Sequence, residues 1–200
     1  MMPQPLFQIK SLFLFDAHAV EECLKWFPPE QAERITGFSS LSRKIEAAAS
    51  YSLLVEMLQS KGLLEELPII EYAEGGKPFL KNYSNLHFNL SHCRRYVAVA
   101  IHSSPVGVDI ECRRKVSQSL IRRVCSEDEQ QSIAAAQDPD MEFLRLWTRK
   151  EAYLKYTGTG IVGPLTDIPP QPTGHSSHAT GHTIETHPLP EGDGWVSICY

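Results

Sequence analysis

The sequence predicts an α+β protein of two pseudo-duplicated lobes, each a small antiparallel sheet packed with helices, with the active site between them. Stretches with helical periodicity and short strand-like runs occur in each half of the 200 residues. Hydrophobic residues make up 42% of the chain, which is enough to bury a sizeable core. We place the lobes at residues 1–103 and 104–200, although no clean sequence repeat accompanies this boundary.

The expected elements follow a similar order in the two halves. The first half is predicted to contain a strand (6–15), short helices (16–36), a longer amphipathic helix (39–61) and three strands (67–73, 85–91, 95–102). The second half is predicted to contain a strand (106–111), helices near 117–123, 126–137 and 139–157, and short strands that end with GWVSICY. Gly62 is expected to end the longer helix, because glycine readily adopts the conformation that closes helices.

Composition narrows the functional classes. The net charge of −5, with 22% charged residues, leaves no basic excess and argues against nucleic acid as the main partner. No run of 18 apolar residues occurs, so no membrane span is expected. The five cysteines are scattered without a CxxC pair, which favours reduced thiols in a cytoplasmic protein over a disulfide framework.

The stretch VGVDIECRR places two carboxylates close together. It is predicted to be a strand, and side chains alternate between the two faces of a strand, so Asp109 and Glu111 point to the same side. Like charges at this separation repel each other, and such pairs are rare without compensation. The pair therefore suggests that something else holds these two acids together.

The stretch LWTRKEAYLKYTGTG, residues 146–160, is predicted to be helical and places a second acid beside a lysine. Glu151 and Lys155 are four residues apart, so they are neighbours on one helix face. The plain alternative is a surface Glu–Lys pair. Trp147 and Leu154 lie on or near this face, however, and indicate that it is at least partly buried.

Together, Asp109, Glu111 and Glu151 would repel each other strongly without a counter-charge. At ~4 Å and an effective dielectric constant near 20, each pair would cost about 4 kcal/mol. Either these acids lie far apart in the fold, or a cation lies among them. Oxygen ligands without His or Cys suit Mg²⁺, which keeps water and substrate phosphates as its remaining ligands. Lys155 is then placed to meet a phosphate oxygen.

Two other features are interpreted as structural. The GTGIVG pattern at 158–163 has a helix before it and Pro164 after it, so we read its glycines as capping and turning the chain rather than as a dinucleotide fingerprint. Three histidines (His175, His178, His182) belong to residues 163–182, which are rich in Pro, Gly, Ser and Thr. They are expected to lie in an exposed loop rather than in a metal site.

The strand and helix motifs together resemble the paired signature of the 4′-phosphopantetheinyl transferases. VGVDIE at 106–111 and WTRKEAYLK at 147–155 match every fixed position of that signature. GGKPFL at 75–80 and FNLSHC at 88–93 resemble two further motifs of the family, in the expected order. The chain length is similar to that of the monomeric, two-lobed Sfp-type members rather than the shorter trimeric synthases, so the resemblance implies a monomer.

The resemblance implies a reaction and its participants. Phosphopantetheine would pass from coenzyme A to a serine of an apo acyl or peptidyl carrier protein, releasing adenosine 3′,5′-bisphosphate. Asp109, Glu111 and Glu151 would hold Mg²⁺, and Glu151 would accept the serine proton, directly or through a water. Lys155 would stabilise the departing phosphate. Asp109, Glu151 and Lys155 are therefore the catalytic candidates.

The same resemblance assigns the coenzyme A contacts. Ser91 and His92, at a strand end, would contact its phosphates, and Lys77, held beside Pro78 in a turn, would contact a phosphate or the adenine. The plain alternatives are a structural histidine and an exposed turn lysine. Lys150, on a different side of its helix, is either a coenzyme A contact or a structural residue.

The first long helix departs from the family pattern. Tyr51 stands where an arginine for the 3′-phosphate is often found, and Arg34, Arg43 or Lys44 are candidate substitutes. Carrier proteins of this kind are acidic, so the basic clusters at 94–95, 113–115 and 122–123 are either docking sites or ordinary solvated charge.

Two other functions stay open. A Mg²⁺-dependent phosphohydrolase acting on coenzyme A would use the same acids on water. A non-catalytic carrier-protein binding module would be expected to have lost part of the acid set, and here the acids and the lysine are all present.

Overall fold

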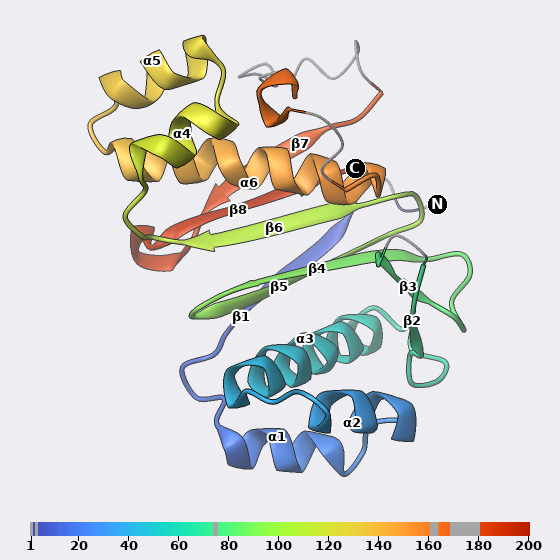
Figure 1. Cartoon of the computed structure of the whole chain (residues 1–200). Coiled ribbons are helices and arrows are strands. Elements are labelled where there is room, and N and C mark those ends of the chain that lie inside the picture. The colour runs from blue at the N-terminus through green and yellow to red at the C-terminus, as the bar shows by residue number, and fades with distance from the viewer. Residues whose placement is uncertain (1, 3, 74–75, 161–163, 169–180) are drawn as a thin grey trace.

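The protein is described here from a computed structural model that covers residues 2, 4–73, 76–160, 164–168 and 181–200. Two small antiparallel sheets lie in the middle of the molecule, with helices on their outer sides (Figure 1). The α+β prediction, with helices packed on small antiparallel sheets, is confirmed. The boundary at residues 103/104 falls between two strands and stays a prediction.

The first sheet is built from strands β1 (Leu6–Ser11), β4 (His87–Cys93) and β5 (Tyr96–His102), in the order β1-β5-β4. Helices α1 (Ala17–Leu24), α2 (Pro29–Thr36) and α3 (Leu41–Ser60) lie on one side of it, and β2 (Ile70–Tyr72) and β3 (Pro78–Leu80) form a separate hairpin. The helix predicted at 39–61 is thus confirmed as α3. Part of the stretch interpreted only as a motif at 75–80 forms β3.

The second sheet is built from β6 (Gly107–Cys112), β7 (Ile184–Pro188) and β8 (Gly194–Cys199), in the order β6-β8-β7. Its helices are α4 (Gln118–Val124), α5 (Glu127–Ala135) and α6 (Pro139–Thr157), with short 3-10 turns η1 (Leu165–Asp167) and η2 (Pro190–Gly192). In both sheets the last strand of the lobe lies between the other two.

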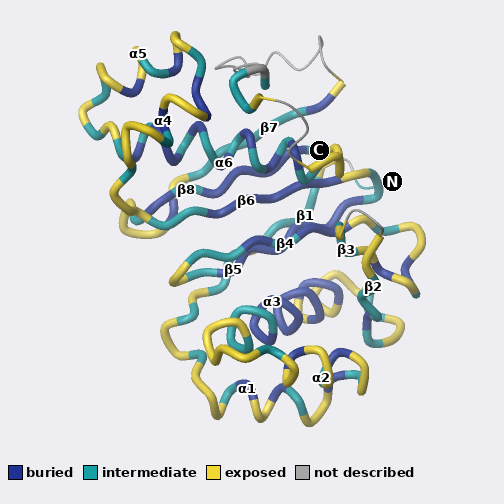
Figure 2. The backbone as a smooth tube through the Cα atoms, viewed as in Figure 1, coloured by how far each residue is buried: buried dark blue, intermediate teal, exposed yellow. Residues whose placement is uncertain are grey.

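The alternation of side chains along β5 divides the core into layers. Val97, Val99 and Ile101 pack against α3 on one face, whereas Ala98 and Ala100 pack on the other face against residues of β6 and β8. Figure 2 shows the result, with α3 and the middle strands buried and the outer helices partly exposed. Helix α6 packs on β6 and β8 on the far side of the second sheet.

The two sheets meet along β4 and β6, where side chains of one strand bond to the backbone of the other. Asn89 Oδ1 accepts from Val108 N at 2.9 Å, and Ser91 Oγ accepts from Ile110 N at 3.4 Å. At the end of this seam Cys93 and Cys112 form a disulfide. The prediction of reduced thiols is therefore wrong for these two cysteines, because spacing in the sequence does not reveal that β4 and β6 are neighbours.

The close packing of α6 on β6 depends on Gly107. A side chain at this position would collide with the backbone of Ala152 and Tyr156, so only glycine lets the helix lie this near the strand. Gly107, the first residue of β6, thus sets the distance between the acids on the strand and the side chains of α6.

In the described ranges, no helix is both long and apolar enough to cross a membrane.

Candidate active site

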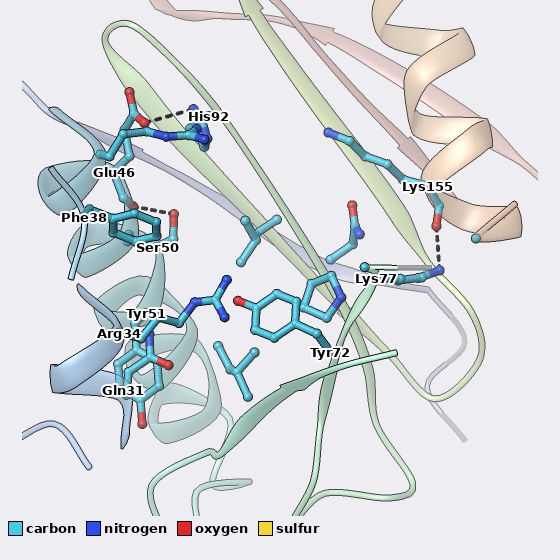
Figure 3. A pocket seen from close by; sticks show the side chains of 18 of the residues that line it. Gln31, Arg34, Phe38, Glu46, Ser50, Tyr51, Tyr72, Lys77, His92 and Lys155 are labelled. Carbon is cyan, nitrogen blue, oxygen red and sulfur yellow. Dashed lines mark hydrogen bonds and ion pairs between the residues drawn. The ribbon is translucent and has the colours of Figure 1, made fainter. Parts of the chain in front are cut away.

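A cavity of about 460 Å³ opens between parts of both halves of the chain (Figure 3). The first half contributes α2, α3, the β2–β3 hairpin and β4 to its walls, and the second half contributes the C-terminal part of α6. Glu151, Lys155, His92, Lys77 and Pro78 all line this cavity. Three of the four segments that carried the family resemblance therefore contribute residues to the cavity wall, and the fourth, at 106–111, contributes none.

Asp109 lies beside the cavity at the seam between the sheets. Its side chain is only 8% exposed, and Oδ1 accepts from Lys155 Nζ at 2.7 Å and from Ser91 Oγ at 2.9 Å. Oδ2 is buried and has no hydrogen-bond partner among the described residues. A buried carboxylate oxygen without a donor is costly, so this atom is suited to accept a ligand that the protein alone does not supply.

Glu111 points to the same side of β6 as Asp109, as the strand period predicts. Its Oε1 accepts from Trp147 Nε1 of α6 at 3.0 Å, and its Oε2 accepts from Arg114 Nε at 3.4 Å. The side chain is 23% exposed, so Glu111 is held by protein donors and also meets solvent.

Glu151 lies on the cavity wall, on the turn of α6 before Lys155. Burial raises the pKa of its carboxyl group, and the nearby charge of Asp109 raises it further, while Lys155 opposes this and Glu111 adds to it. The strand and helix acids therefore lie close enough to disfavour each other's charge. Within the described part of the chain, no group of three or more His, Cys, Asp or Glu side chains has the arrangement of a metal site.

Lys150 and Lys155, on the same helix, have different surroundings. Lys150 Nζ donates to Val124 O at 3.0 Å, Glu129 Oε2 at 2.7 Å and Leu165 O at 2.9 Å, and its side chain is 4% exposed. All three ammonium protons thus have fixed acceptors. Of the two alternatives for Lys150, the structural one holds.

Ser91 and His92 lie near the end of β4, next to the acids. Ser91 Oγ lies 3.0 Å from Lys155 Nζ, so the hydroxyl joins Lys155 and Asp109 in one network. His92 Nδ1 lies 3.4 Å from Glu46 Oε2. Figure 3 draws this contact as a dashed line. Burial lowers the pKa of His92, and Glu46 partly opposes that shift.

Lys77 extends from the β2–β3 hairpin toward the end of α6. Its Nζ donates to Lys155 O at 2.5 Å and to Tyr156 O at 3.1 Å, and the first of these bonds is drawn in Figure 3. Burial lowers the pKa of this lysine. The ammonium group thus points at carbonyl groups of α6. The sequence suggested either a contact with a phosphate or the adenine, or an exposed turn lysine, and neither interpretation includes these bonds.

The α3 side of the cavity contains residues that sequence reasoning placed only in part. Arg43, Glu46, Ala47 and Ser50 share one helical face and line the cavity, but Glu46 was not singled out. Its spacing of three residues from the candidate Arg43 is the signal that was available. Tyr51 is 1% exposed, and its hydroxyl donates to Pro68 O at 2.7 Å.

On α2, Arg34 also lines the cavity, with its guanidinium 3.7 Å from the centre of the Tyr72 ring. Arg34 and Arg43, but not Lys44, are thus the two proposed substitutes that reach the cavity wall.

The glycine-rich pattern at 158–163 and the three histidines were interpreted as structural. Of these, residues 161–163, His175 and His178 lie outside the described residues. Gly158 has φ +71° and follows the last residue of α6, so it caps the helix as expected. His182 is buried, with its ring centre 4.9 Å from that of Tyr153, rather than exposed as predicted.

Comparisons with known proteins agree with this geometry. The profile of the 4′-phosphopantetheinyl transferase superfamily matches residues 105–191. The chain is 31% identical over 170 residues to the 4′-phosphopantetheinyl transferase HetI of a Nostoc species, covering 80% of this chain and 67% of the relative. It is 33% identical over 147 residues to psf-1 of Bacillus pumilus, covering 66% and 63%. It is 29% identical over 149 residues to Sfp of Bacillus subtilis, covering 72% and 66%.

The match to psf-1 spans 63% of that relative and the match to Sfp spans 66%, so the chain covers slightly less than two thirds of each. The match to HetI extends through both halves of the fold, since it includes 80% of this chain. With the acids, lysine and serine of the matched motifs meeting beside one cavity, the chain belongs to the 4′-phosphopantetheinyl transferase superfamily.

Proposed function

We propose that this protein transfers 4′-phosphopantetheine from coenzyme A to a serine of an apo acyl or peptidyl carrier protein, releasing adenosine 3′,5′-bisphosphate. The observation that carries the proposal is the network of Asp109, Ser91 and Lys155, with Glu151 beside it on the wall of a cavity that both halves of the chain line. The names of the relatives support the same reaction. We propose in addition that the protein works as a cytoplasmic monomer, without nucleic-acid or membrane partners.

The acids fit a Mg²⁺ ion by their chemistry. They are oxygen ligands, Asp109 keeps a buried oxygen without a donor, and the pKa of Glu151 is raised first by burial and then by the charge of Asp109, both of which a cation would offset. Asp109, Glu111 and Glu151 would hold the ion. When bound, Mg²⁺ would supply positive charge to the pyrophosphate of coenzyme A.

The protein's own groups account for the proton and the leaving group. The serine oxygen of the carrier forms a bond to phosphorus, and the bond from that phosphorus to the bridging oxygen breaks. Glu151 is the acceptor for the serine proton, directly or through a water, because its carboxyl group lies on the cavity wall one turn of α6 from Lys155. Lys155, already donating to Asp109 and Ser91, places a positive charge where the departing phosphate develops negative charge.

The cavity walls supply groups for the rest of coenzyme A. His92 lines the cavity near the end of β4, where its ring can donate to a phosphate oxygen. Ser91 donates its hydroxyl proton to Asp109 and accepts from Lys155, so it would contribute by orienting that lysine toward the phosphates. Arg34 and Arg43 add positive charge on the α2 and α3 side, where the resemblance would place the 3′-phosphate. Pro78 lines the same cavity from the hairpin, near where the adenine is expected.

The basic clusters considered for carrier docking differ in how much charge they offer. In the cluster at 113–115, Arg113 pairs with Asp138 at 2.6 Å and Lys115 pairs with Asp140 at 2.9 Å. Internal pairs thus balance much of this charge. In the cluster at 94–95, Arg95 likewise pairs with Asp193. We propose the cluster at 122–123, whose arginines have no ion pair among the described residues, as the better candidate for an acidic carrier protein.

Intact-protein mass spectrometry tests the function directly. The protein is incubated with coenzyme A, Mg²⁺ and a panel of apo carrier proteins, and a carrier that gains the mass of phosphopantetheine supports the proposal. Degradation of coenzyme A without a modified carrier would instead indicate the phosphohydrolase. Carrier binding with no change in either molecule would indicate the non-catalytic binding module.

A further inference from the structure

We propose that Lys77 is a positioning residue, which holds the last turn of α6 across the cavity and thereby fixes Lys155 and Glu151. The proposal deepens the transferase function and rests on it for its kinetic consequences. It is carried by the two bonds from Lys77 Nζ, to Lys155 O at 2.5 Å and to Tyr156 O at 3.1 Å.

The acceptors are atoms that a helix end leaves without a partner. The last four carbonyl groups of an α-helix have no amide of the same helix to accept from, and they carry partial negative charge. Helix α6 ends at Thr157, and the amide of Gly158 closes back on Leu154 O, so the carbonyls of residues 155 and 156 are among those that need donors. An ammonium group from another segment meets that need.

The bond partners lie far apart in the chain, which makes the contact a cross-link between distant segments. Lys77 precedes β3 in the hairpin, and its acceptors are 78 and 79 residues further along. In Figure 3 the hairpin lysine reaches the backbone of α6, while the side chain of Lys155 extends the other way. The pKa of Lys77 is lowered by burial, so the cation is held there against a desolvation cost.

The same helix turn is also held from its other side. Gly107 of β6 allows the backbone of Ala152 and Tyr156 to approach the strand closely. On the other side, a Cβ atom added at Gly158 would lie 3.3 Å from Lys77 Cδ, so the lysine side chain packs against the glycine that follows the helix. The end of α6 is therefore fixed by β6 beneath it and by Lys77 across the cavity. Since Lys77 bonds to the backbone of Lys155 itself, its loss would displace the residue whose ammonium contacts Asp109 and Ser91.

The kinetic test compares Lys77→Met with Lys77→Arg, and uses Lys81→Met as the control. Lys81 follows the same hairpin and pairs with Glu71 at 2.7 Å on the surface, away from α6. For Lys77→Met we expect kcat for carrier modification to fall about tenfold, with KM for coenzyme A changed less than about twofold, because charge-assisted bonds that orient the reacting groups are lost. Arginine should restore most of kcat, and Lys81→Met should match the parent.

Hydrogen exchange of the backbone amides supplies a readout that does not depend on catalysis. The amides at 156–159 should exchange faster in Lys77→Met than in the parent and in Lys81→Met, because the end of α6 frays once its cross-link is removed. If the parent modifies no carrier, the function proposed above fails, and this exchange measurement still decides the role of Lys77. If Lys77→Met does not fold by circular dichroism, Lys77→Gln takes its place with the same expectations.

Two results would overturn the proposal. A rise in KM for coenzyme A with kcat unchanged would make Lys77 a ligand contact. Unchanged exchange at 156–159 would show that Lys77 does not hold the helix end.

Discussion

The two sides of α6 use the same residue type in opposite ways. On the side facing α5 and η1, Lys150 is sealed at 4% exposure with its three donors bonded. On the side facing the cavity, Lys155 is 28% exposed and bonds to Asp109 and Ser91, which lie where substrate phosphates are proposed to bind. The difference teaches that a lysine in a motif is assigned by its partners and its access to ligand, since sequence shows neither.

The largest expected effect is the loss of transfer on the cavity side. Asp109→Ala and Glu151→Ala should each lower carrier modification by about 1,000-fold or more, because the charge that organises the pyrophosphate and the base for the serine are removed. The measurement is the rate of holo-carrier formation by mass spectrometry. Asp128→Ala, which changes an exposed acid on α5, is the control and should retain the parent's rate. Parent-like transfer by either cavity variant would disprove the role of that acid.

The next effect belongs to the sealed side and should appear in stability. Lys150→Met leaves the Glu129 carboxylate buried without its cation, which costs about 3–5 kcal/mol in the free energy of unfolding. Urea denaturation measures this loss. Lys155→Met is the matched variant on the cavity side. It also removes the cation from a buried carboxylate, but Ser91 still donates to Asp109 and Lys155 is partly exposed, so the loss of unfolding free energy should be smaller than in Lys150→Met, while transfer is impaired. The comparison breaks if Lys155→Met proves the more destabilising of the two.

The seam between the sheets offers a third test, of somewhat smaller size. Cys93 and Cys112 are 19 residues apart, and a disulfide over such a span stabilises by about 3 kcal/mol through restriction of the unfolded chain. Adding a reductant should therefore lower the urea midpoint of the parent. The double variant Cys93→Ser/Cys112→Ser should start lower and show no response to reductant. An equal response in both proteins would mean that the effect arises at another cysteine.

Sequence reasoning located the groups whose neighbours are local. The two-residue period of a strand placed Asp109 and Glu111 on one face, and the helical period placed Glu151 beside Lys155; both pairs lie as expected toward the junction of β6 and α6. These inferences need only the geometry of one element.

The contacts that were not predicted all join separate elements. The partners of Lys150 lie on α4, α5 and η1, Lys77 reaches across to α6, and Cys93 meets Cys112 only because β4 lies beside β6. Such contacts depend on how elements are arranged, and a single sequence shows no periodicity that specifies this. The family resemblance identified motifs and their order, but it did not predict these contacts between residues far apart in the sequence.

The smallest expected effect is a gain of stability in Glu151→Gln without metal. The folded-state pKa of Glu151 is raised above its ordinary value of 4.5, so the folded protein loses stability as pH rises from that value through the folded pKa. Glutamine removes this loss. The gain should be absent in acid and should reach a few tenths of a kcal/mol, at most about 1, near pH 7, after allowance for solvent screening of a partly exposed group.

Thermal unfolding at a series of pH values measures this gain, and adding Mg²⁺ with coenzyme A should reverse the order of the two proteins. The parent should then gain more than Glu151→Gln, because a ligand stabilises the form that binds it better and only the parent keeps the full acid set. If the variant is less stable than the parent by the same amount at every pH, the pKa of Glu151 is not raised by burial and by the charge of Asp109. The cavity side of α6 would then resemble the sealed side, with each charge already balanced by protein.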